Sequence, residues 1–587
     1  MNRAGAVRVA LVALVAALLM PASAVAGRAI DAGLGCRTAF CASVSADGSR
    51  VVFPYHGELI AGAGTWQLYE WHDGKVRSLL APGLSQGQFL QMEGASADAT
   101  HVFVSTRAAL SPEDTDGSAL DVYDIQGGTP SLISTGPLDH PAEQTAAMPF
   151  FQGSSPDGSR VFFQDTRALT VEDLDICPSL YERAAGQTRM IAPNPEPPPF
   201  PICEWPDFGG LSRDGSHLFF VSGVDLQAGD DEGEDIYQQV GASLTRLATG
   251  PEPASNCTKR LRVFASSGNG DTILFSTNGP ALPEDTNGTD DLYKRRPDGS
   301  FVLVSKGTPA AETCAPSQSV RGVALSADGG TTVFETVAAL SPADKDAAPD
   351  LYSADDNGAF ELLSSGPTDP QVEEPTTIFP DWLSAASEDA RTVAFETQQR
   401  LVAADRDDSA DVYLRAGGLT SLLLEGPPSR PAPTAELSGI SADGNTVAFA
   451  TRAGLVAGDT NRQRDYYLRR IGSKRPVLLS AETTAPAVWI ARRAARLPAA
   501  RVAIRLVCPK AEENGPCRGN LRLAQKRNAK PLGQRAFQIA VGKRKRIVVR
   551  LRRPLPPAKQ SLVARARGID SLGNARVSTR TVRFGRR

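Results

Sequence analysis

One short element recurs eight times along the chain and restricts what it can fold into. A Ser-x-Asp tripeptide, with Asn in place of Asp in the fifth copy, precedes a β-rich run at Ser45, Ser96, Ser155, Ser212, Ser267, Ser326, Ser387 and Ser441. These serines span 396 residues in seven steps, a mean spacing of about 57 residues. A repeat of this length is typical of architectures in which each unit buries its apolar faces against its neighbours.

Within each repeat the pattern predicts four short strands. Asp followed by Gly, as at Asp157 and Gly158, favours a tight hairpin, because glycine adopts positive φ without penalty. Apolar residues then alternate, as at Val447 and Phe449, which places them on one face of a strand. Further strand signals are Asp-x-Tyr, at 121–123, 235–237, 291–293, 350–352 and 411–413, and a later run such as 132–134. Two copies have alanine after the aspartate, at Ala99 and Ala390, so their turns must differ or carry strain.

Four-stranded antiparallel sheets that cannot bury both faces alone are stable when packed around an axis. We therefore expect an all-β chain with an eight-bladed β-propeller over residues 27–480, seven blades being the alternative. The run Ser-Pro-Asp-Gly-x-x-Val-x-Phe at 155–163, together with Asp-Ile-Tyr at 235–237, resembles the WD-like repeat of TolB-type β-propellers. This resemblance covers roughly residues 39–480. It implies a binding scaffold, or a propeller of the kind attached to hydrolase domains in some peptidases, but we expect no such α/β-hydrolase domain after the repeats of this chain.

The first 26 residues have the features of a secretory signal. Arg3 and Arg8 precede an apolar run that ends at Met20, and small residues follow up to Ala26, where we place cleavage. The apolar run is short for a membrane span, and no later stretch reaches the length of a spanning helix. The sequence thus predicts an exported protein with no membrane span, located outside the cell or in its envelope.

Eight cysteines in an exported chain predict disulfides, although 105 pairings are possible in principle. The repeat spacing narrows this choice. Cys257–Cys314 and Cys177–Cys203 are plausible links between neighbouring blades, and Cys36–Cys41 and Cys508–Cys517 would close short local loops.

Acidic loops recur before the Asp-x-Tyr strands. Alternate carboxylate and amide oxygens could bind calcium, which needs six to eight oxygen ligands. The candidate ligands are Asp114, Asp116, Asp121, Asp285, Asn287, Asp291, Asp459, Asn461 and Asp465. The alternative is that these side chains cap turns on a solvated loop. No other cofactor is expected.

Charge divides the chain into two parts. From Ala481 to Arg587 there are 27 Lys and Arg against 4 Asp and Glu, a net charge of +23, and the preceding residues carry a net charge of −27. The basic part alternates basic and apolar residues in about seven runs, which predicts half-buried strands with basic outer faces. These runs suit an immunoglobulin-like β-sandwich over residues 481–587. The segments at 508–519 and 570–574 resemble β-sandwich modules appended to exported bacterial proteins.

Polyanions of the cell wall or capsule are the partners that such a basic surface favours outside the cell. Two alternatives are a charged surface with no dedicated ligand and docking of the basic domain onto the acidic loops of the propeller. Export makes nucleic acid the least favoured partner. We expect the chain to act as a monomer.

Two functional hypotheses follow. The first is a non-catalytic extracellular scaffold whose propeller face binds a protein or glycan while the basic domain binds polyanions. The second is an exported glycan hydrolase or lyase that uses carboxylates of the acidic loops as acid and base. The first is favoured, with no catalytic residue assigned, because the histidines (His56, His72, His101, His140 and His217) are scattered without metal-ligand spacing. A sialidase-type propeller is disfavoured because glycine directly follows the aspartate of the repeat.

Overall fold

The computed structural model describes most of the chain between residues 42 and 584. The gaps within this range are 56–58, 61–66, 82–89, 116–118, 139–148, 174–176, 193–205, 225, 228–232, 251–259, 287–289, 307–319, 346–348, 368–383, 407–408, 424–434, 457–458, 460–462, 474, 481–487, 510–515, 527–528, 557–560 and 570–574. The expected signal peptide lies outside the described residues. Among those that are described, no helix has the length and apolar character needed to cross a membrane.

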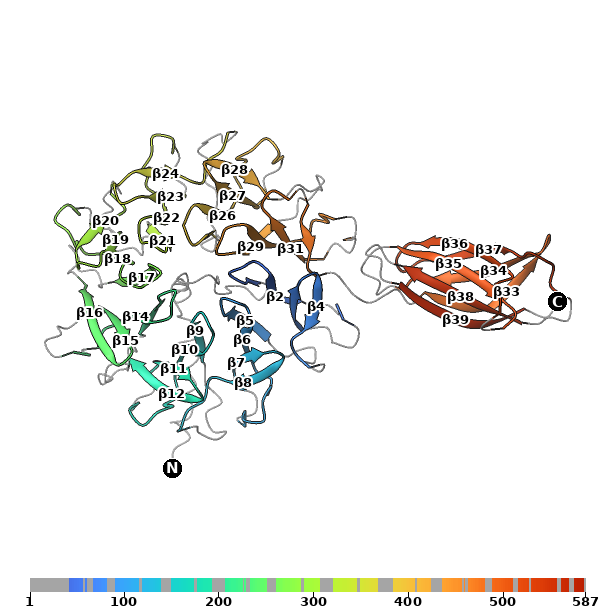
Figure 1. The fold of residues 1–587 in the computed structure, drawn as a ribbon, viewed down its shortest axis with the longest axis horizontal. Helices are drawn as coiled ribbons and strands as arrows, with labels where there is room; N and C mark the ends of the chain where they lie inside the picture. The colour runs from blue at the N-terminus through green and yellow to red at the C-terminus, as the bar shows by residue number, and fades with distance from the viewer. Residues whose placement is uncertain are drawn as a thin grey trace, which may run out of the picture.

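Eight four-stranded sheets stand around a common axis (Figure 1), so eight blades are confirmed and the seven-bladed alternative is wrong. Every sheet is an antiparallel meander of strands consecutive in the sequence. The first four blades comprise β1 (Ser43–Val44), β2 (Arg50–Tyr55), β3 (Gln67–His72), β4 (Lys75–Ser78); β5 (Leu90–Ala95), β6 (His101–Thr106), β7 (Asp121–Gln126), β8 (Thr129–Leu132); β9 (Phe150–Ser154), β10 (Arg160–Asp165), β11 (Ser179–Ala184), β12 (Gln187–Ala192); and β13 (Asp207–Leu211), β14 (His217–Ser222), β15 (Asp235–Val240), β16 (Ser243–Thr249).

The other four blades follow the same order. They comprise β17 (Leu261–Ser266), β18 (Ile273–Thr277), β19 (Asp291–Arg295), β20 (Phe301–Leu303); β21 (Val320–Leu325), β22 (Thr332–Thr336), β23 (Asp350–Ala354), β24 (Phe360–Leu362); β25 (Ser384–Ala386), β26 (Thr392–Thr397), β27 (Asp411–Ala416), β28 (Leu419–Leu422); and β29 (Ala435–Ile440), β30 (Thr446–Thr451), β31 (Asp465–Arg470), β32 (Val477–Leu478).

The repeated Ser-x-Asp element forms the turn between the first two strands of each blade. In the third blade the Ser155 hydroxyl donates to Asp157 (2.5 Å) and accepts the backbone N–H of Arg160 (3.0 Å). Gly158 has a φ of +74°, as the Asp-Gly pair predicts. The alanines at the same place, Ala99 and Ala390, have φ values of +54° and +55°. These two turns therefore keep the shape of the others and carry the backbone strain expected for alanine.

The middle residues of the eight turns form a belt at the inner end of the blades, which we call the turn belt. Its residues are Ala46, Ala97, Pro156, Arg213, Gly268, Ala327, Glu388 and Ala442. The N–H of Ala46 donates to the carbonyl of Ala97 (2.6 Å), and the N–H of Ala442 in the last blade donates to Ala46 (2.8 Å). Proline at 156 has no N–H to give, and there Arg160 reaches Gly215 in the next blade instead (2.8 Å).

Among the described strands, the first and last blades exchange none where they close the ring. Phe53 of β2 is fully buried, and its ring lies 4.9 Å from that of Tyr466 in β31, measured between centroids. Gly48 has no room for a side chain, because a Cβ there would lie 2.6 Å from the Thr446 hydroxyl oxygen. Closure therefore rests on side-chain packing, on the turn belt and on the hydrogen bond that the Tyr55 hydroxyl donates to Asp465 (3.3 Å).

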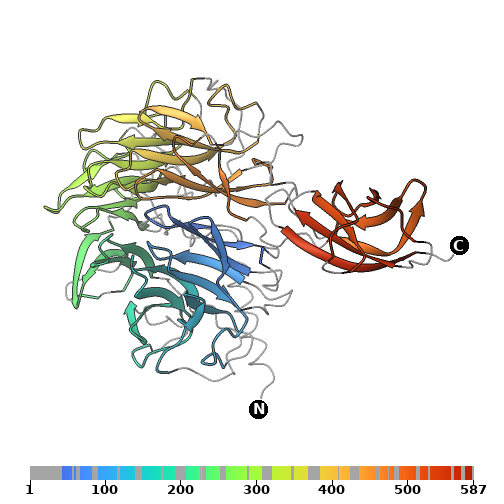
Figure 2. The same cartoon turned by 45° about the vertical axis from the view of Figure 1, so that its right-hand side comes forward.

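The basic domain is a separate unit, the C-terminal module, which lies beside the ring in Figures 1 and 2. Its strands are β33 (Trp489–Leu497), β34 (Arg501–Val507), β35 (Cys517–Ala524), β36 (Gly533–Ile539), β37 (Arg544–Arg550), β38 (Ser561–Ile569) and β39 (Ala575–Phe584). They form one sheet in the order β36-β35-β38-β39-β33-β34-β37, in which β33 and β39 pair in parallel. The edge strands β36 and β37 lie next to each other, so the sheet nearly closes around its own core. The seven predicted strands are thus confirmed.

Acid should destabilise the propeller through its turn aspartates. Hydrogen bonds lower the pKa of Asp47 and of Asp157. The larger effect comes from the turn serine's hydroxyl, and the next from the backbone N–H two residues after the aspartate. A carboxyl with a lowered folded pKa stabilises the fold above its unfolded pKa of about 3.9, and this contribution is lost as the pH falls through the folded value. Urea unfolding between about pH 6 and pH 2 should show this loss. Ser155→Ala should make the loss smaller, and an unchanged pH slope in that variant would contradict the assignment.

Candidate functional site

Tyrosine hydroxyls donate hydrogen bonds to the described parts of the acidic loops. Tyr123, Tyr293 and Tyr467 donate to Asp114, Asp285 and Asp459. The aspartates that open the tyrosine strands accept instead from serines at the end of the blade: Ser134 to Asp121 (2.6 Å), Ser305 to Asp291 (2.5 Å) and Ser480 to Asp465 (2.5 Å). Of the nine candidate calcium ligands, three thus hold the loop to its blade and three join the start of the tyrosine strand to the end of the blade.

The remaining three candidates, Asp116, Asn287 and Asn461, lie outside the described residues. Within the described ranges, no three His, Cys, Asp or Glu side chains are grouped closely enough to hold a metal ion. Calcium binding by complete loops stays a prediction. The hydrogen bonds of the other six correspond to the capped-turn alternative.

Removing one of these hydroxyls should measurably weaken a blade. Burial, and next the hydrogen bond to Asp285, raise the pKa of Tyr293 above its usual value, so the hydroxyl stays protonated and donates at any ordinary pH. Tyr293→Phe should therefore lower the free energy of unfolding by about 1.5–3 kcal/mol, the usual range for a hydrogen bond to a charged group. Asp285→Asn, which keeps an acceptor of similar size, should cost less. Urea denaturation measures both, and a loss below about 0.5 kcal/mol in Tyr293→Phe would contradict this role.

A small cavity, which the sequence patterns did not reveal, lies against five of the eight residues of the turn belt. The cavity has a volume of about 90 Å³, enough for a few water molecules, and its wall includes Gly268, Ala327 and Ala442. The two charged belt residues, Arg213 of the fourth blade and Glu388 of the seventh, form an ion pair beside it. The sequence did contain a signal for this belt. The middle position of the eight turns holds six small or cyclic residues and two residues of opposite charge.

A buried carboxyl with a raised pKa lies between the last two blades. Glu396 of β26 accepts the backbone N–H of Leu437 in β29. Burial raises its pKa to about 7, against the opposing effects of that N–H and of Arg464. Perturbed carboxyls often mark functional sites. Here the partner is the backbone of the next blade, so the contact joins two blades.

Two of the histidines occupy equivalent places in the repeat. His101 and His217 begin β6 and β14, and each packs on the turn glycine of the following blade, Gly158 and Gly270. The Nδ1 atom of His101 lies 2.7 Å from Asp124, and this hydrogen bond raises its pKa. Because both histidines occupy the same repeat position and pack on a turn glycine, we interpret them as packing residues.

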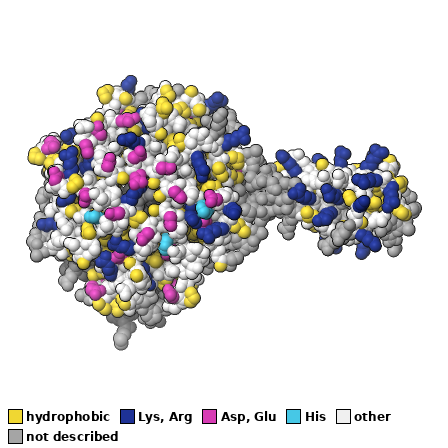
Figure 3. Space-filling view, viewed as in Figure 1, with side chains coloured by type: hydrophobic (Ala, Val, Ile, Leu, Met, Phe, Trp, Pro, Cys, Tyr) yellow, Lys and Arg dark blue, Asp and Glu magenta, His cyan; other side chains and the backbone are white. Residues whose placement is uncertain are grey.

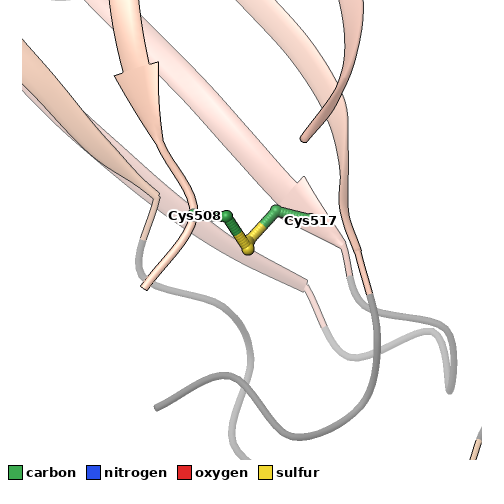
Figure 4. The surroundings of a disulfide bond; sticks show 2 residues. All are labelled: Cys508 and Cys517. Carbon is green, nitrogen blue, oxygen red and sulfur yellow. A yellow bond between two sulfur atoms is a disulfide. The ribbon is translucent and has the colours of Figure 1, made fainter. Parts of the chain in front are cut away.

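The Cys508–Cys517 disulfide is confirmed and lies at the end of the C-terminal module (Figure 4). It is consistent with an oxidising compartment. Cys177 is also disulfide-bonded, and the other sulfur lies outside the described residues. The remaining cysteines, Cys36, Cys41, Cys203, Cys257 and Cys314, lie outside them as well, so their pairing stays a prediction.

The C-terminal module presents basic side chains on adjacent strands. Figure 3 shows Lys and Arg over its visible face. The strand register sets exposed arginines directly opposite one another: Arg501 with Arg550, Arg505 with Arg546, and Arg522 with Arg565. The acidic residues of the module, Glu482, Glu512, Glu513 and Asp570, all lie outside the described ranges. Like charges directly opposite in a sheet are destabilising, so these strands carry an electrostatic cost.

No protein-family model and no curated protein matches the sequence. Among solved structures, the chain is similar to one from a structural and mechanistic analysis of two prolyl endopeptidases, with 15% sequence identity and a TM-score of 0.37. The alignment covers 77% of this chain and 59% of that one, so the chain spans less than two thirds of the length of the protein it matches.

Proposed function

We propose that this protein is an extracellular, non-catalytic scaffold whose C-terminal module binds polyanions. The propeller is a TolB-type scaffold in this proposal, and the first 26 residues direct its export. Its loop face binds a protein or glycan partner outside the cell, while the module holds the scaffold on an anionic polymer.

One observation carries the proposal, namely the exposed arginines that face each other across β34 and β37. Arg501 and Arg505 pair with Arg550 and Arg546, at positions where Cβ atoms lie only about 5 Å apart. A solvated surface with no ligand gains nothing from such pairs. A bound chain of anionic groups removes the repulsion and turns each pair into a set of charge-assisted hydrogen bonds.

Binding of the full-length protein to polyphosphate and to polygalacturonate tests the proposal. Titration calorimetry at about 20 mM salt should detect binding to both, and the affinity should fall steeply as salt rises, because the contacts are exposed ion pairs. Arg505→Gln with Arg546→Gln should weaken both interactions by about tenfold or more. Lys306→Gln with Arg391→Gln, which removes the same charge from exposed positions on the propeller, should change them by less than about twofold.

No binding to either polymer at low salt would overturn the polyanion proposal. The non-catalytic part has its own test, since turnover of any member of a glycan panel by the secreted protein would favour the hydrolase or lyase alternative.

A further inference from the structure

We infer that the C-terminal module recognises the sugar rings of an anionic polysaccharide, with Trp489 as the stacking platform. This inference rests on the proposed polyanion binding and specifies the class of polymer. Trp489 is 51% exposed and is the only aromatic among the large apolar side chains that are exposed in the described part of the chain. Most tryptophans in folded proteins are largely buried, so an open indole on a basic sheet is a feature to explain.

Neighbouring contacts hold the indole in place. The Arg580 guanidinium lies over the ring, 5.3 Å from its centroid, and also donates to the backbone carbonyl of Ile490 (2.9 Å). Arg580 therefore occupies one face of the ring and is itself anchored to the strand that carries the tryptophan. The exposed fraction of Trp489 leaves the rest of the indole available to a ligand. A stacking surface that is already ordered loses little entropy on binding.

Arginines lie on both sides of this tryptophan on the outer surface of the sheet. In one direction Trp489 pairs with Val507 of β34, which pairs with Arg544 of β37. In the other direction Arg580 of β39 lies over the indole, and the residue before it, Thr579, pairs with Arg565 of β38. Since neighbouring strands lie about 4.8 Å apart, the exposed Arg544 stands about 10 Å from the tryptophan, and the exposed Arg565 lies two strands away on the other side.

This row matches the chemistry of an acidic sugar polymer. The C–H face of a pyranose ring packs on an indole, while carboxylates or sulfates on flanking sugars meet guanidinium groups. Val577, 42% exposed and two residues before Thr579 on the same strand, widens the apolar part of the row. A polyanion without rings, such as polyphosphate, would use the arginines and leave the tryptophan unused.

The experiment compares three ligands on the full-length protein: polygalacturonate, polyphosphate and a single-stranded thymidine oligonucleotide, each at the same salt concentration. Trp489→Ala should weaken polygalacturonate binding by about tenfold and leave polyphosphate binding within about twofold. Trp489→Phe should restore much of the affinity for polygalacturonate. Val548→Ala, at an exposed apolar position on β37 outside this row, serves as the matched control and should change neither interaction.

The outcomes separate this inference from the proposed function. Wild-type binding to both polymers with no selective effect of Trp489→Ala would overturn the sugar-stacking inference and leave the polyanion proposal standing. No binding of the wild type to any polyanion would overturn both. Tighter, Trp489-dependent binding of the oligonucleotide than of polygalacturonate would show that a nucleic acid, and not a polysaccharide, occupies the row.

Discussion

Phe53→Ala is expected to lower the free energy of unfolding by about 3–5 kcal/mol and to open the ring between its first and last blades. Phe53 is fully buried and packs against Tyr466 at 4.9 Å and Tyr69 at 6.1 Å between ring centroids. Truncation would leave a cavity at the one blade interface where no chain connection limits separation. In a ring closed by exchange of a strand, the same truncation would leave backbone pairing to hold the blades together.

Urea unfolding and limited proteolysis measure the two effects. Phe334→Ala is the matched control, because Phe334 is equally buried but stacks on Tyr352 of its own blade, with 6.0 Å between ring centroids. The control should lose comparable stability while its native state resists protease. If Phe53→Ala loses less than about 1 kcal/mol, or resists protease as well as the control does, closure does not depend on this contact.

Replacing both Cys508 and Cys517 by serine should lower the stability of the C-terminal module by about 2–3 kcal/mol. The two sulfurs close a short loop, nine residues apart in sequence, and both cysteines are fully buried in the module's core. A closed loop has fewer conformations in the unfolded chain, and two buried hydroxyls would also replace an apolar link.

Scanning calorimetry of the full-length variant measures this effect. The module has a core of its own, so its transition should move to lower temperature while that of the propeller stays in place. Reduction of the wild type should shift the module's transition in the same direction. An unchanged module transition in the double variant would show that the disulfide adds no stability.

The blades could be predicted from the sequence because the information in each repeat is local. Ser155, Asp157 and Gly158 define a turn through hydrogen bonds within six residues, and Asp-x-Tyr marks a strand that pairs with the one before it. The two alanine turns could be recognised as either different in shape or strained, and the structure shows the second. Local patterns repeated eight times determine the fold class before any long-range contact is known.

The contacts at the candidate sites depend on which residues the ring brings together. Arg213 and Glu388 are 175 positions apart, and only the folded ring places them beside the same cavity. The tyrosine-aspartate bonds had a sequence signal that was not used, a spacing of eight or nine residues, as between Asp285 and Tyr293. The row around Trp489 needs the order of strands in the module, which alternation alone does not give.

The central claim is that eight sheets form a ring whose first and last blades face each other. A disulfide engineered across this closing interface tests that claim most directly. A Cβ placed on Gly439 of β29 would lie 3.9 Å from the Cβ of Val44 in β1, the separation typical of a disulfide. In the Val44→Cys, Gly439→Cys variant, peptide mapping by mass spectrometry should find these two residues joined in nearly all molecules. Free thiols at both positions after oxidation would show that the two blades do not meet and would contradict the closed ring.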